Sequence, residues 1–381
     1  MTTIINRKID LLQKLEQKSI FLFGPRQTGK TWLIRHLLKD YKTYNLLKSE
    51  IFLKLSHSPQ RIREESNASD KFIIIDEIQR LPILLNEVHL IIEETETHFL
   101  LTGSSAHKLR RAGVNLLGGR ARMEHLHPLS ICELQQDFDL VRAVNYGLLP
   151  SIYLSENPDA DLRAYIGLYL KEEIAAEGLT RNLPAFSRFL EVAACCNGKM
   201  LNYTKIANDA QVARTTVQEY FSILKDTLLA YELPAWKKSQ KRKPISTAKC
   251  HWFDSGVART LQQRGLAQIG TPEFGEAFEN YIFHELQTFT DYCALLPLAY
   301  WRSISGFEVD FVLNDTTAIE VKTSKNIGYQ DLKNLKALQE ENLLKNYVLV
   351  CFETAPRTVD GIQIMPWRMF LEALWHKELL Q

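Results

Sequence analysis

Residues 24–31 bring together the residue types that bind a chain of phosphates. In order they are Gly24, Pro25, Arg26, Gln27, Thr28, Gly29, Lys30 and Thr31, which fit the pattern G-x-x-x-x-G-K-T. The glycines let backbone N–H groups point at phosphate oxygens. Lys30 can reach the β- and γ-phosphates, and the Thr31 hydroxyl can bind Mg²⁺. We therefore expect ATP and Mg²⁺ as ligands of this loop.

The flanking residues predict the context that such a loop needs. Residues 19–23 form an apolar run typical of a buried strand, and residues 32–38 are apolar at helical spacing. A helix that begins at the loop adds its partial positive charge to the phosphate site. Strand, glycine loop and helix together favour a phosphate site over a chance glycine turn.

Two carboxylates follow a second apolar run, residues 72–75. Such a run is typical of a strand in a parallel sheet, whose carboxyl edge binds ligands in α/β proteins. Asp76 can hold the Mg²⁺ shell, and Glu77 can orient and deprotonate the attacking water. A strand end that simply meets solvent is the alternative.

Two further segments supply candidates for the γ-phosphate. The apolar strand at residues 98–101 ends in Thr102 and Ser104, either of which can sense the γ-phosphate, although a turn that caps the next helix is an equal alternative. Arg120 can neutralise transition-state charge on the ATP of a neighbouring subunit, which requires a homo-oligomer. A solvated loop arginine is the other interpretation.

The middle of the chain predicts a DNA-binding type of element. Residues 203–220 fit a helix-turn-helix in which Gln211 stands where a turn glycine is usual, and residues 228–234 can form a wing strand. The helix residues that would face a DNA groove are Arg214, Thr215, Thr216 and Gln218. The residues that would contact phosphates are Lys237, Lys238, Lys241, Arg242 and Lys243. A lid on the ATPase module or a protein-docking surface remains the alternative.

The C-terminal part predicts a second group of charged side chains. The expected order is helix 276–290, strands 298–302, 307–313 and 317–323, helix 329–341 and strand 346–352. Strand periodicity places Glu320 and Lys322 on one face, where Asp310 of the partner strand could meet them. Glu279 lies on the preceding helix.

Composition limits the class of protein. The 381 residues are 45% hydrophobic and 24% charged with a net charge of +1, so a polyanion would meet only a local basic patch. No apolar run approaches membrane-spanning length, and the N-terminus lacks the apolar region of a signal peptide. The six cysteines are scattered, as in a reducing cytosol, and we expect a cytoplasmic protein. We expect an α/β protein with domains at 1–150, 151–245 and 246–381.

These motifs resemble those of a known family. The N-terminal part is similar to the AAA+ superfamily, and more narrowly to predicted prokaryotic AAA+ ATPases fused to a C-terminal domain of unknown function. The segments that carry this resemblance are residues 24–31, 76–79, 101–105, 119–120, 126–130 and 168–174 together with the C-terminal motifs. The family has no settled substrate.

The C-terminal part resembles the PD-(D/E)xK nuclease fold, also called restriction-endonuclease-like. The resemblance implies that Asp310 and Glu320 bind Mg²⁺, that Glu279 completes the metal shell and that Lys322 polarises the attacking water. A fold kept for binding without catalysis is the alternative.

Two functions are therefore open from the sequence. The first is an ATP-hydrolysing AAA+ protein that acts on DNA and carries a nuclease-like tail. The second is a nucleotide-dependent regulatory switch whose C-terminal domain binds a protein partner without catalysis. A metabolic kinase fits poorly, because nothing after residue 150 predicts a small-substrate pocket.

Overall fold

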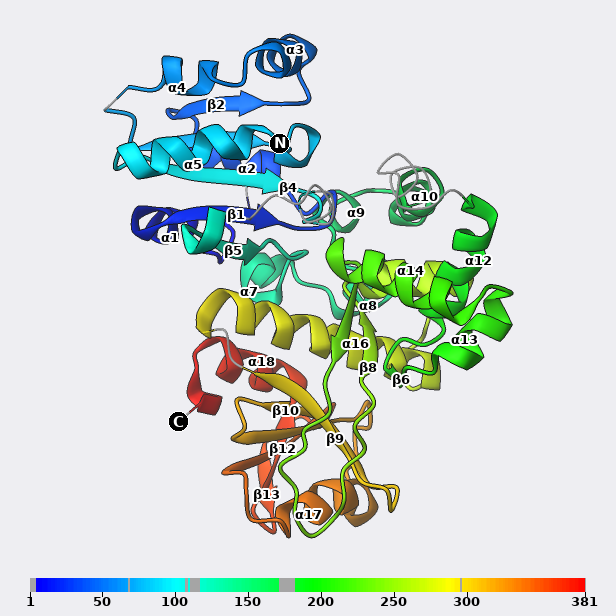
Figure 1. Ribbon diagram of the computed structural model, residues 1–381. Helices are drawn as coiled ribbons and strands as arrows, with labels where there is room; N and C mark the ends of the chain where they lie inside the picture. The colour runs from blue at the N-terminus through cyan, green and yellow to red at the C-terminus, as the bar shows by residue number, and fades with distance from the viewer. Residues whose placement is uncertain are drawn as a thin grey trace. The chain divides into compact units, whose positions relative to one another are not determined.

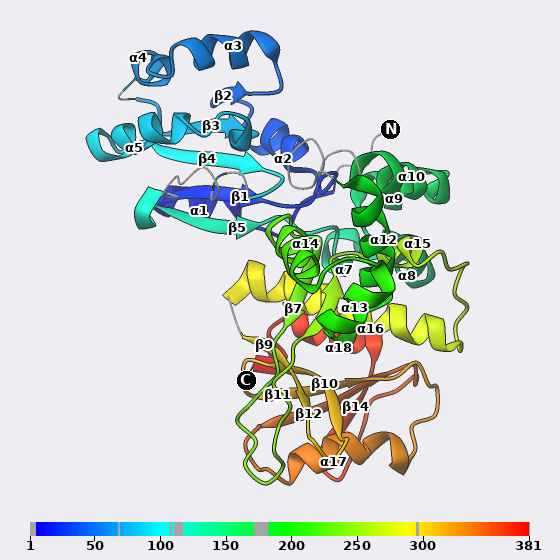
Figure 2. The ribbon, with the colours of Figure 1, turned by 45° about the vertical axis from the view of Figure 1, so that its right-hand side comes forward.

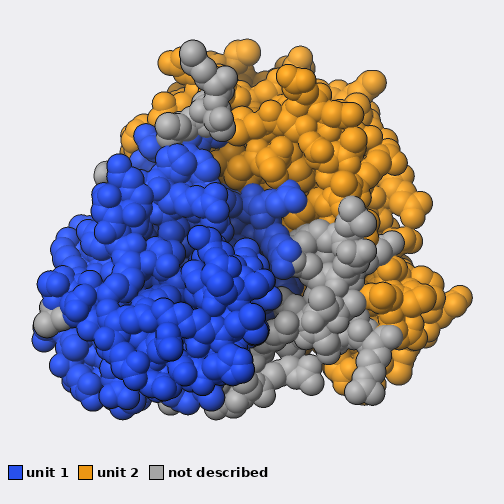
Figure 3. Space-filling view, turned by 90° about the horizontal axis from the view of Figure 1, so that it is seen from above, with its two compact units in different colours: residues 1–128, 226–229 blue, residues 129–225, 230–381 orange. Residues whose placement is uncertain are grey.

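The computed structural model describes residues 5–67, 69–106, 109, 117–170, 182–294 and 297–380. Residues 171–174 of the resemblance thus lie outside the described chain. Contacts between residues divide the molecule into two compact units, residues 1–128 with 226–229 and residues 129–225 with 230–381 (Figure 3). The expected domain boundaries at 150 and 245 stay predictions. Within the described ranges, no helix is long and apolar enough to cross a membrane.

The first unit is built on a five-stranded parallel sheet, as expected (Figure 1). In sheet order its strands are β2 (Lys42–Asn45), β3 (Phe72–Asp76), β4 (His98–Gly103), β1 (Ser19–Phe23) and β5 (Ala121–His125). Its helices are α1 (Leu11–Gln17), α2 (Lys30–Leu37), α3 (Ser49–His57), α4 (Arg61–Glu65) and α5 (Leu84–Glu94). Because all the strands are parallel, their carboxyl ends lie along one edge of the sheet, which is where α/β proteins bind ligands.

Alternate residues of the central strands pack against α5 and form a buried core on one side of the sheet. Phe21 of β1, Ile73 of β3 and Phe99 of β4 belong to one buried cluster, together with Leu85 and Val88 of α5. All three strands are buried along nearly their whole length, so their continuous apolar runs reflect burial on both faces of the sheet. Figure 2 shows β4 between β1 and β3, so the strand that precedes Ser104 separates the two predicted ATP motifs.

The second unit begins with helices and a small three-stranded sheet. The first helices are α7 (Ile131–Leu134), α8 (Leu140–Tyr146), α9 (Pro150–Tyr153), α10 (Pro158–Ala164) and a π-helix at Tyr165–Leu170. The segment for which a helix-turn-helix and a wing are expected follows as α12 (Leu183–Ala194), β6 (Lys199–Met200), α13 (Tyr203–Ala210), α14 (Arg214–Asp226), β7 (Ala230–Leu233) and β8 (Lys249–Trp252). Strand β8 pairs with both β6 and β7, so this sheet continues to Trp252, past the expected boundary at 245.

The remaining elements form a six-stranded mixed sheet with helices. After α15 (Ser255–Leu261) they are α16 (Pro272–Phe289), β9 (Leu298–Arg302), β10 (Glu308–Leu313), β11 (Thr317–Val321), α17 (Lys333–Gln339), β12 (Asn346–Cys351), β13 (Arg357–Val359), β14 (Ile362–Pro366) and α18 (Trp367–Trp375). The order β13-β14-β12-β11-β10-β9 has β9, β10 and β11 antiparallel and β11, β12 and β14 parallel. Every C-terminal helix and strand expected from the sequence is present.

Two local details explain how this part folds. Asn314 and Asp315 both have positive φ, 54°, in the tight connection from β10 to β11, a conformation that these two residue types tolerate best after glycine. In β12, Leu349 and Cys351 pack with Leu335 of α17, whereas the alternate residues face the other side of the sheet. The even-numbered residues of β11 share the face of Ala318, which belongs to the same cluster as Leu335.

Candidate nucleotide site and carboxylate centre

The G-x-x-x-x-G-K-T residues form a compact loop between β1 and α2. Gly29 has φ 95° at the start of α2, a left-handed conformation that favours glycine. A Cβ on Gly24 would lie 2.4 Å from the carbonyl oxygen of Leu126, so this position also needs glycine. The Lys30 Nζ donates to the carbonyl oxygens of Gly24 at 2.6 Å and Pro25 at 3.0 Å. Lys30 therefore lies over the loop, where a phosphate would be held.

The environment of Lys30 is unfavourable to an unpaired charge. Only 6% of the residue is exposed, and this burial lowers the pKa of its ammonium group to about 8 although Glu77 and Asp76 act in the opposite direction. A bound triphosphate would supply the negative charge that this lysine lacks.

Asp76 is the centre of a hydrogen-bond network at the carboxyl edge of the sheet. Its Oδ2 accepts from the Thr31 hydroxyl and from the Asn45 side-chain amide, each at 3.2 Å, and its Oδ1 accepts from the Thr102 hydroxyl at 2.5 Å. The hydroxyl and carboxylate expected to bind Mg²⁺ are thus in direct contact. Oxygen ligands of this kind suit Mg²⁺. Thr102, one of the two γ-phosphate candidates, is bonded to Asp76.

Glu77 and Ser104 are joined through a residue that the sequence analysis did not single out. The Nε2 of Gln79 donates to Glu77 Oε2 at 2.5 Å and to Ser104 Oγ at 3.2 Å. All three side chains are buried. We name the connected residues Lys30, Thr31, Asn45, Asp76, Glu77, Gln79, Thr102 and Ser104, together with the 24–31 loop, the nucleotide site.

An N-terminal arginine supports the same loop. Arg7 donates from Nη1 to the carbonyl oxygen of Thr28 and from Nη2 to that of His127, each at 2.6 Å. It therefore ties the loop to the segment after β5. Sequence reasoning missed Arg7, because a single arginine in a polar terminus has no type or spacing that marks a function.

Arg120 is not part of the nucleotide site of its own chain. It precedes β5, whose register with β1 pairs Ala121 with Ser19, at the edge opposite the loop after Phe23. The five-residue length of β1 corresponds to roughly 16 Å. Arg120 forms an ion pair with Glu93 of α5 and contributes to the lining of an open depression of about 480 Å³. Any contact with a γ-phosphate must therefore come from another subunit.

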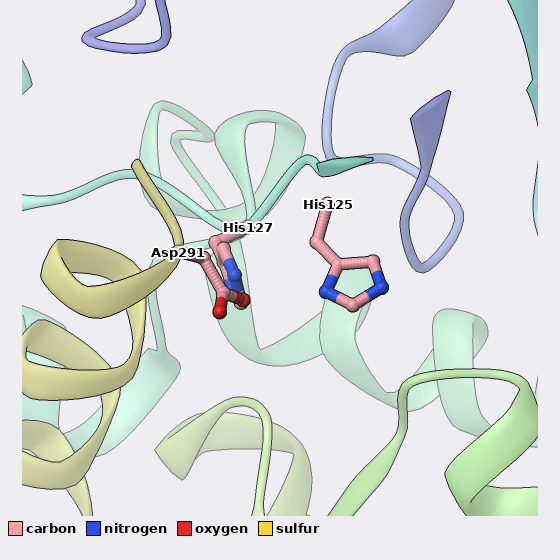
Figure 4. A group of neighbouring side chains, drawn as sticks. All are labelled: His125, His127 and Asp291. Carbon is pink, nitrogen blue, oxygen red and sulfur yellow. The ribbon is translucent and has the colours of Figure 1, made fainter. Parts of the chain in front are cut away.

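Two histidines lie at the carboxyl end of β5. His125 ends β5, and His127 lies two residues further, with their rings edge to face and their centroids 6.3 Å apart (Figure 4). Asp291, also drawn in Figure 4, belongs to the second unit. Two histidines have the chemistry of metal ligands but are too few to define a metal site.

In the second unit the predicted C-terminal residues form a group of charges. Lys322 Nζ is 2.7 Å from Glu320 Oε1, as expected for residues two apart on one strand. Asp310 Oδ2 accepts from the backbone N–H of Val321 at 2.8 Å, and Asn334 of α17 donates to Glu320 at 3.3 Å. Asp310 is also close enough to shift the pKa values of both Glu279 and Glu320.

Three more charged residues belong to this group. Lys249 of β8, with 3% of its side chain exposed, lies 2.5 Å from Glu308 Oε1 and 3.7 Å from Glu279 Oε1. Glu308 also pairs with Arg302 at 2.7 Å. We call the seven residues the carboxylate centre: Glu279, Glu308, Asp310 and Glu320 with Lys249, Arg302 and Lys322. One feature of the sequence could have pointed to Lys249: it begins β8, a short strand that contains no other lysine, arginine, aspartate or glutamate.

Two carboxylate oxygens of the centre are buried without a hydrogen-bond donor. Burial, reinforced by the charge of Asp310, raises the pKa of Glu279 and of Glu320. Glu279 Oε1 and Glu320 Oε2 are buried atoms without a hydrogen-bond donor. Such a donor set fits a hard divalent cation. Among the described residues, however, Glu279, Asp310 and Glu320 do not form a trio whose ligand atoms all lie within 4.8 Å of one another. A shared ion would require the side chains to move.

The helix residues predicted to face a DNA groove are exposed or partly exposed on α14. Arg214, Thr215 and Gln218 are exposed on α14, and Thr216 is partly exposed. Gln211, which replaces the usual turn glycine, has φ 55° at the end of α13 and so takes the left-handed conformation that the turn needs.

The basic residues between 237 and 243, which we call the basic wing, were expected to contact DNA phosphates. Several of them instead contact acidic residues or carbonyl oxygens of the same unit. Lys238 pairs with Asp315 at 2.8 Å, and Arg242 pairs with Glu340 at 2.5 Å. Lys241 donates to the carbonyl oxygen of Glu340. The backbone N–H groups of residues 240–242 donate to the carboxylate of Glu341. Three of the five residues predicted to contact phosphates, Lys238, Lys241 and Arg242, therefore form ion pairs or hydrogen bonds within the unit.

Comparison with known proteins assigns the parts of the chain to families. Residues 16–135 match an AAA domain. Residues 137–268 match a domain of unknown function, DUF8612, and residues 274–370 match another, DUF4143. An uncharacterized protein of Haemophilus influenzae is 23% identical over 296 residues, which cover 69% of this chain and 72% of the relative.

Two solved structures have low overall similarity. The replication initiator DnaA bound to AMPPCP and single-stranded DNA has a TM-score of 0.29 at 16% identity, covering 58% of this chain and 90% of that one. The Aeropyrum pernix Orc1 protein in complex with DNA has a TM-score of 0.29 at 14% identity, covering 70% and 94%. Scores at this level carry no argument about function. The family matches do: the chain contains an AAA-type ATPase domain at residues 16–135, followed by segments that match two domains of unknown function.

Proposed function

We propose that the chain binds and hydrolyses ATP with Mg²⁺ and uses the cycle to act on DNA. The observation that carries the ATPase proposal is the network around Asp76, which places the Thr31 hydroxyl against the carboxylate at 3.2 Å beside Lys30 and Glu77. Lys30 and Thr31 begin α2, whereas Asp76 and Glu77 lie at the end of β3, and the four groups meet at the carboxyl edge of one sheet.

Each residue has a separable role in hydrolysis. Lys30 and the loop N–H groups bind the β- and γ-phosphates, and Thr31 and Asp76 would hold Mg²⁺, which neutralises developing charge. Glu77 orients the attacking water and accepts its proton. Ser104 reports the γ-phosphate to Glu77 through Gln79, a role supported by the hydrogen bonds of Gln79 to both residues. Arg120 acts in trans on the ATP of a neighbouring subunit.

The DNA part of the proposal is supported by the winged helix and the carboxylate centre. The exposed face of α14 presents Arg214, Thr215 and Gln218, whose side chains can reach base edges or phosphates. In the carboxylate centre, Asp310, Glu320 and Glu279 would hold Mg²⁺ or Mn²⁺, which activates water for attack on a phosphodiester. Lys322 would stabilise the charged phosphate.

One observation favours a second function. Lys249 and Lys322 already neutralise part of the carboxylate centre, and the basic wing is bonded to acidic residues. A tail of this kind also suits a nucleotide-dependent switch that binds a protein partner without cleaving anything.

A single set of assays separates the two functions. The ATPase rate of the purified chain is measured with and without DNA, and DNA cleavage is followed with Mg²⁺ or Mn²⁺ in the presence and absence of ATP. Stimulation of ATP hydrolysis by DNA supports the first function, and a rate indifferent to DNA supports the switch. Absence of ATP hydrolysis under all conditions would reject both.

A further inference from the structure

Gln79 occupies an unusual position between two parts of the nucleotide site. Its side-chain N–H₂ group donates to both Glu77 and Ser104, while its own Oε1 is buried without a donor. A buried amide oxygen without a partner is unfavourable by about 1–3 kcal/mol. The conformation therefore sacrifices one hydrogen bond in order to direct both amide hydrogens at Glu77 and Ser104.

The backbone on both sides is adapted to this arrangement. Glu77 has φ 65° and ψ 45°, a left-handed conformation that is uncommon for a residue with a side chain. A Cβ on Gly103 would lie 2.3 Å from Gln79 Oε1 and 3.2 Å from its Cδ. The Gln79 amide fills the space that any other residue at 103 would need. Gly103 is thus required by Gln79, since its own φ is not positive.

We propose that Gln79 is a positioning residue of the ATPase, which fixes the Glu77 carboxylate for water activation and couples it to Ser104 at the end of β4. This inference rests on the proposed ATPase function. Glu77 Oε2 is held by the amide, which leaves Oε1 to accept the proton of the attacking water. Movement of Ser104 on contact with a γ-phosphate is transmitted to Glu77 through the same amide group.

Removal of the amide should impair chemistry and leave binding intact. Gln79→Ala is expected to lower the kcat for ATP by roughly 10- to 100-fold, because a catalytic group that loses its orientation loses rate to that extent. KM and the affinity for a non-hydrolysable ATP analogue should stay within about twofold, since the Gln79 amide donates to Glu77 and Ser104 and not to Lys30 or Thr31, which bind the phosphates and Mg²⁺. The exposed Gln13 of α1 provides the matched control, and Gln13→Ala should change neither quantity.

Gly103→Ala tests the same idea without altering Gln79. The added methyl group displaces the amide, so this variant should reproduce the Gln79→Ala phenotype. In the double variant the methyl group has room, and the loss of kcat should equal that of Gln79→Ala alone rather than the product of both losses. In a Glu77→Gln background, which lacks the base, Gln79→Ala should produce no further loss in single-turnover rates.

The possible outcomes are distinct. A wild-type kcat in Gln79→Ala, or multiplied losses in either double variant, would overturn the role of Gln79 while leaving the ATPase proposal intact. A matching rise in KM and fall in melting temperature would assign Gln79 a structural role and also overturn it. If the wild-type chain itself hydrolyses no ATP, the underlying function fails instead.

Discussion

The nucleotide site and the carboxylate centre hold their acids in opposite ways. Asp76 accepts hydrogen bonds from three neutral donors, Thr31, Asn45 and Thr102. The acids of the carboxylate centre are instead paired with the ammonium groups of Lys249 and Lys322, and two of their buried oxygens have no donor. Asp76 is thus held by neutral dipoles, whereas the acids of the carboxylate centre form ion pairs with lysines.

Neutral donors and ammonium groups both hold a carboxylate in place, but only ammonium groups also balance its charge. Neutral donors fix a carboxylate without cancelling its charge, so Asp76 keeps its full attraction for a metal ion. A buried ammonium ion both fixes and neutralises its partner, and it competes with a metal ion for the same oxygen. We therefore expect the nucleotide site to bind its ligands without rearrangement, and the carboxylate centre to rearrange first.

The largest expected effect tests the first half of this comparison. Lys30→Ala should abolish or severely weaken ATP binding, because the triphosphate loses the charge that contacts its β- and γ-phosphates. Glu77→Gln should instead bind ATP normally and hydrolyse it at least 100-fold more slowly, since only proton transfer is lost. Fluorescent-nucleotide binding and phosphate release measure the two quantities. Wild-type hydrolysis by both variants would refute the assignment of the site.

The second prediction concerns the cations of the carboxylate centre. Lys249→Met removes the ammonium ion from Glu308 and Glu279, and a buried pair that loses one partner is destabilised by about 3–5 kcal/mol. Added Mn²⁺ should restore part of this stability, because a divalent cation can take the place of the lysine. The rise in melting temperature per millimolar Mn²⁺ should thus be larger for Lys249→Met than for the wild type, and absent in Asp310→Ala.

The control for this experiment is a lysine outside the centre. Lys238→Met removes an exposed ion pair with Asp315, for which a stability change below about 1 kcal/mol is expected. Its response to Mn²⁺ should equal that of the wild type. Equal Mn²⁺ responses in Lys249→Met and the wild type would mean that the lysine and the metal ion do not compete. This result would contradict the expectation that the carboxylate centre must rearrange before it binds a metal ion.

The two sites also differ in how far the sequence predicts them. The 24–31 loop, Asp76 and Glu77 are adjacent in sequence to the strands that position them, so local pattern alone placed them at one edge of a parallel sheet. Gln79 and Asn45 were missed, because their roles depend on which strands are neighbours in the sheet. Lys249 and Glu308 were missed for the same reason, since they meet only when β8 and β10 approach in three dimensions. The ion pairs of Lys238 and Arg242 were missed because their acidic partners, Asp315 and Glu340, are about 75 to 100 residues away, and the phosphate contacts expected of residues 237–243 stay a prediction.

A third, smaller effect is expected from Arg120. Within one chain it lies at the edge of the sheet opposite the nucleotide site and pairs with Glu93. Arg120→Ala should slow hydrolysis while leaving nucleotide affinity nearly intact, and the wild-type rate per subunit should rise with protein concentration as subunits associate. Glu93→Ala serves as the control, because it frees the arginine without removing it. A concentration-independent rate that Arg120→Ala does not change would exclude the role in trans.

The smallest effect is expected from a buried carboxyl group outside both sites. Because this group, like Asp76, accepts hydrogen bonds from neutral donors, it tests what such donors do to a buried carboxyl group. Glu285 of α16 is fully buried, and it accepts hydrogen bonds from the Ile131 N–H at 2.8 Å and from the Trp375 Nε1 at 2.9 Å. Burial raises the pKa of this carboxyl group from 4.5 to about 7, against the opposing effect of these hydrogen bonds. Its proton is thus held more tightly in the folded than in the unfolded chain.

The sign of the pH dependence follows from this shift. Below pH 4.5 both states hold the proton and the stabilisation is complete, and it is lost as the pH rises through the folded pKa of about 7. The unfolding free energy of the wild type relative to Glu285→Gln, which cannot ionise, should therefore fall by about 3 kcal/mol between pH 4.5 and 7. Urea unfolding of both proteins across this range measures the difference. A difference that is constant or rises with pH would show that hydrogen bonds outweigh burial at Glu285.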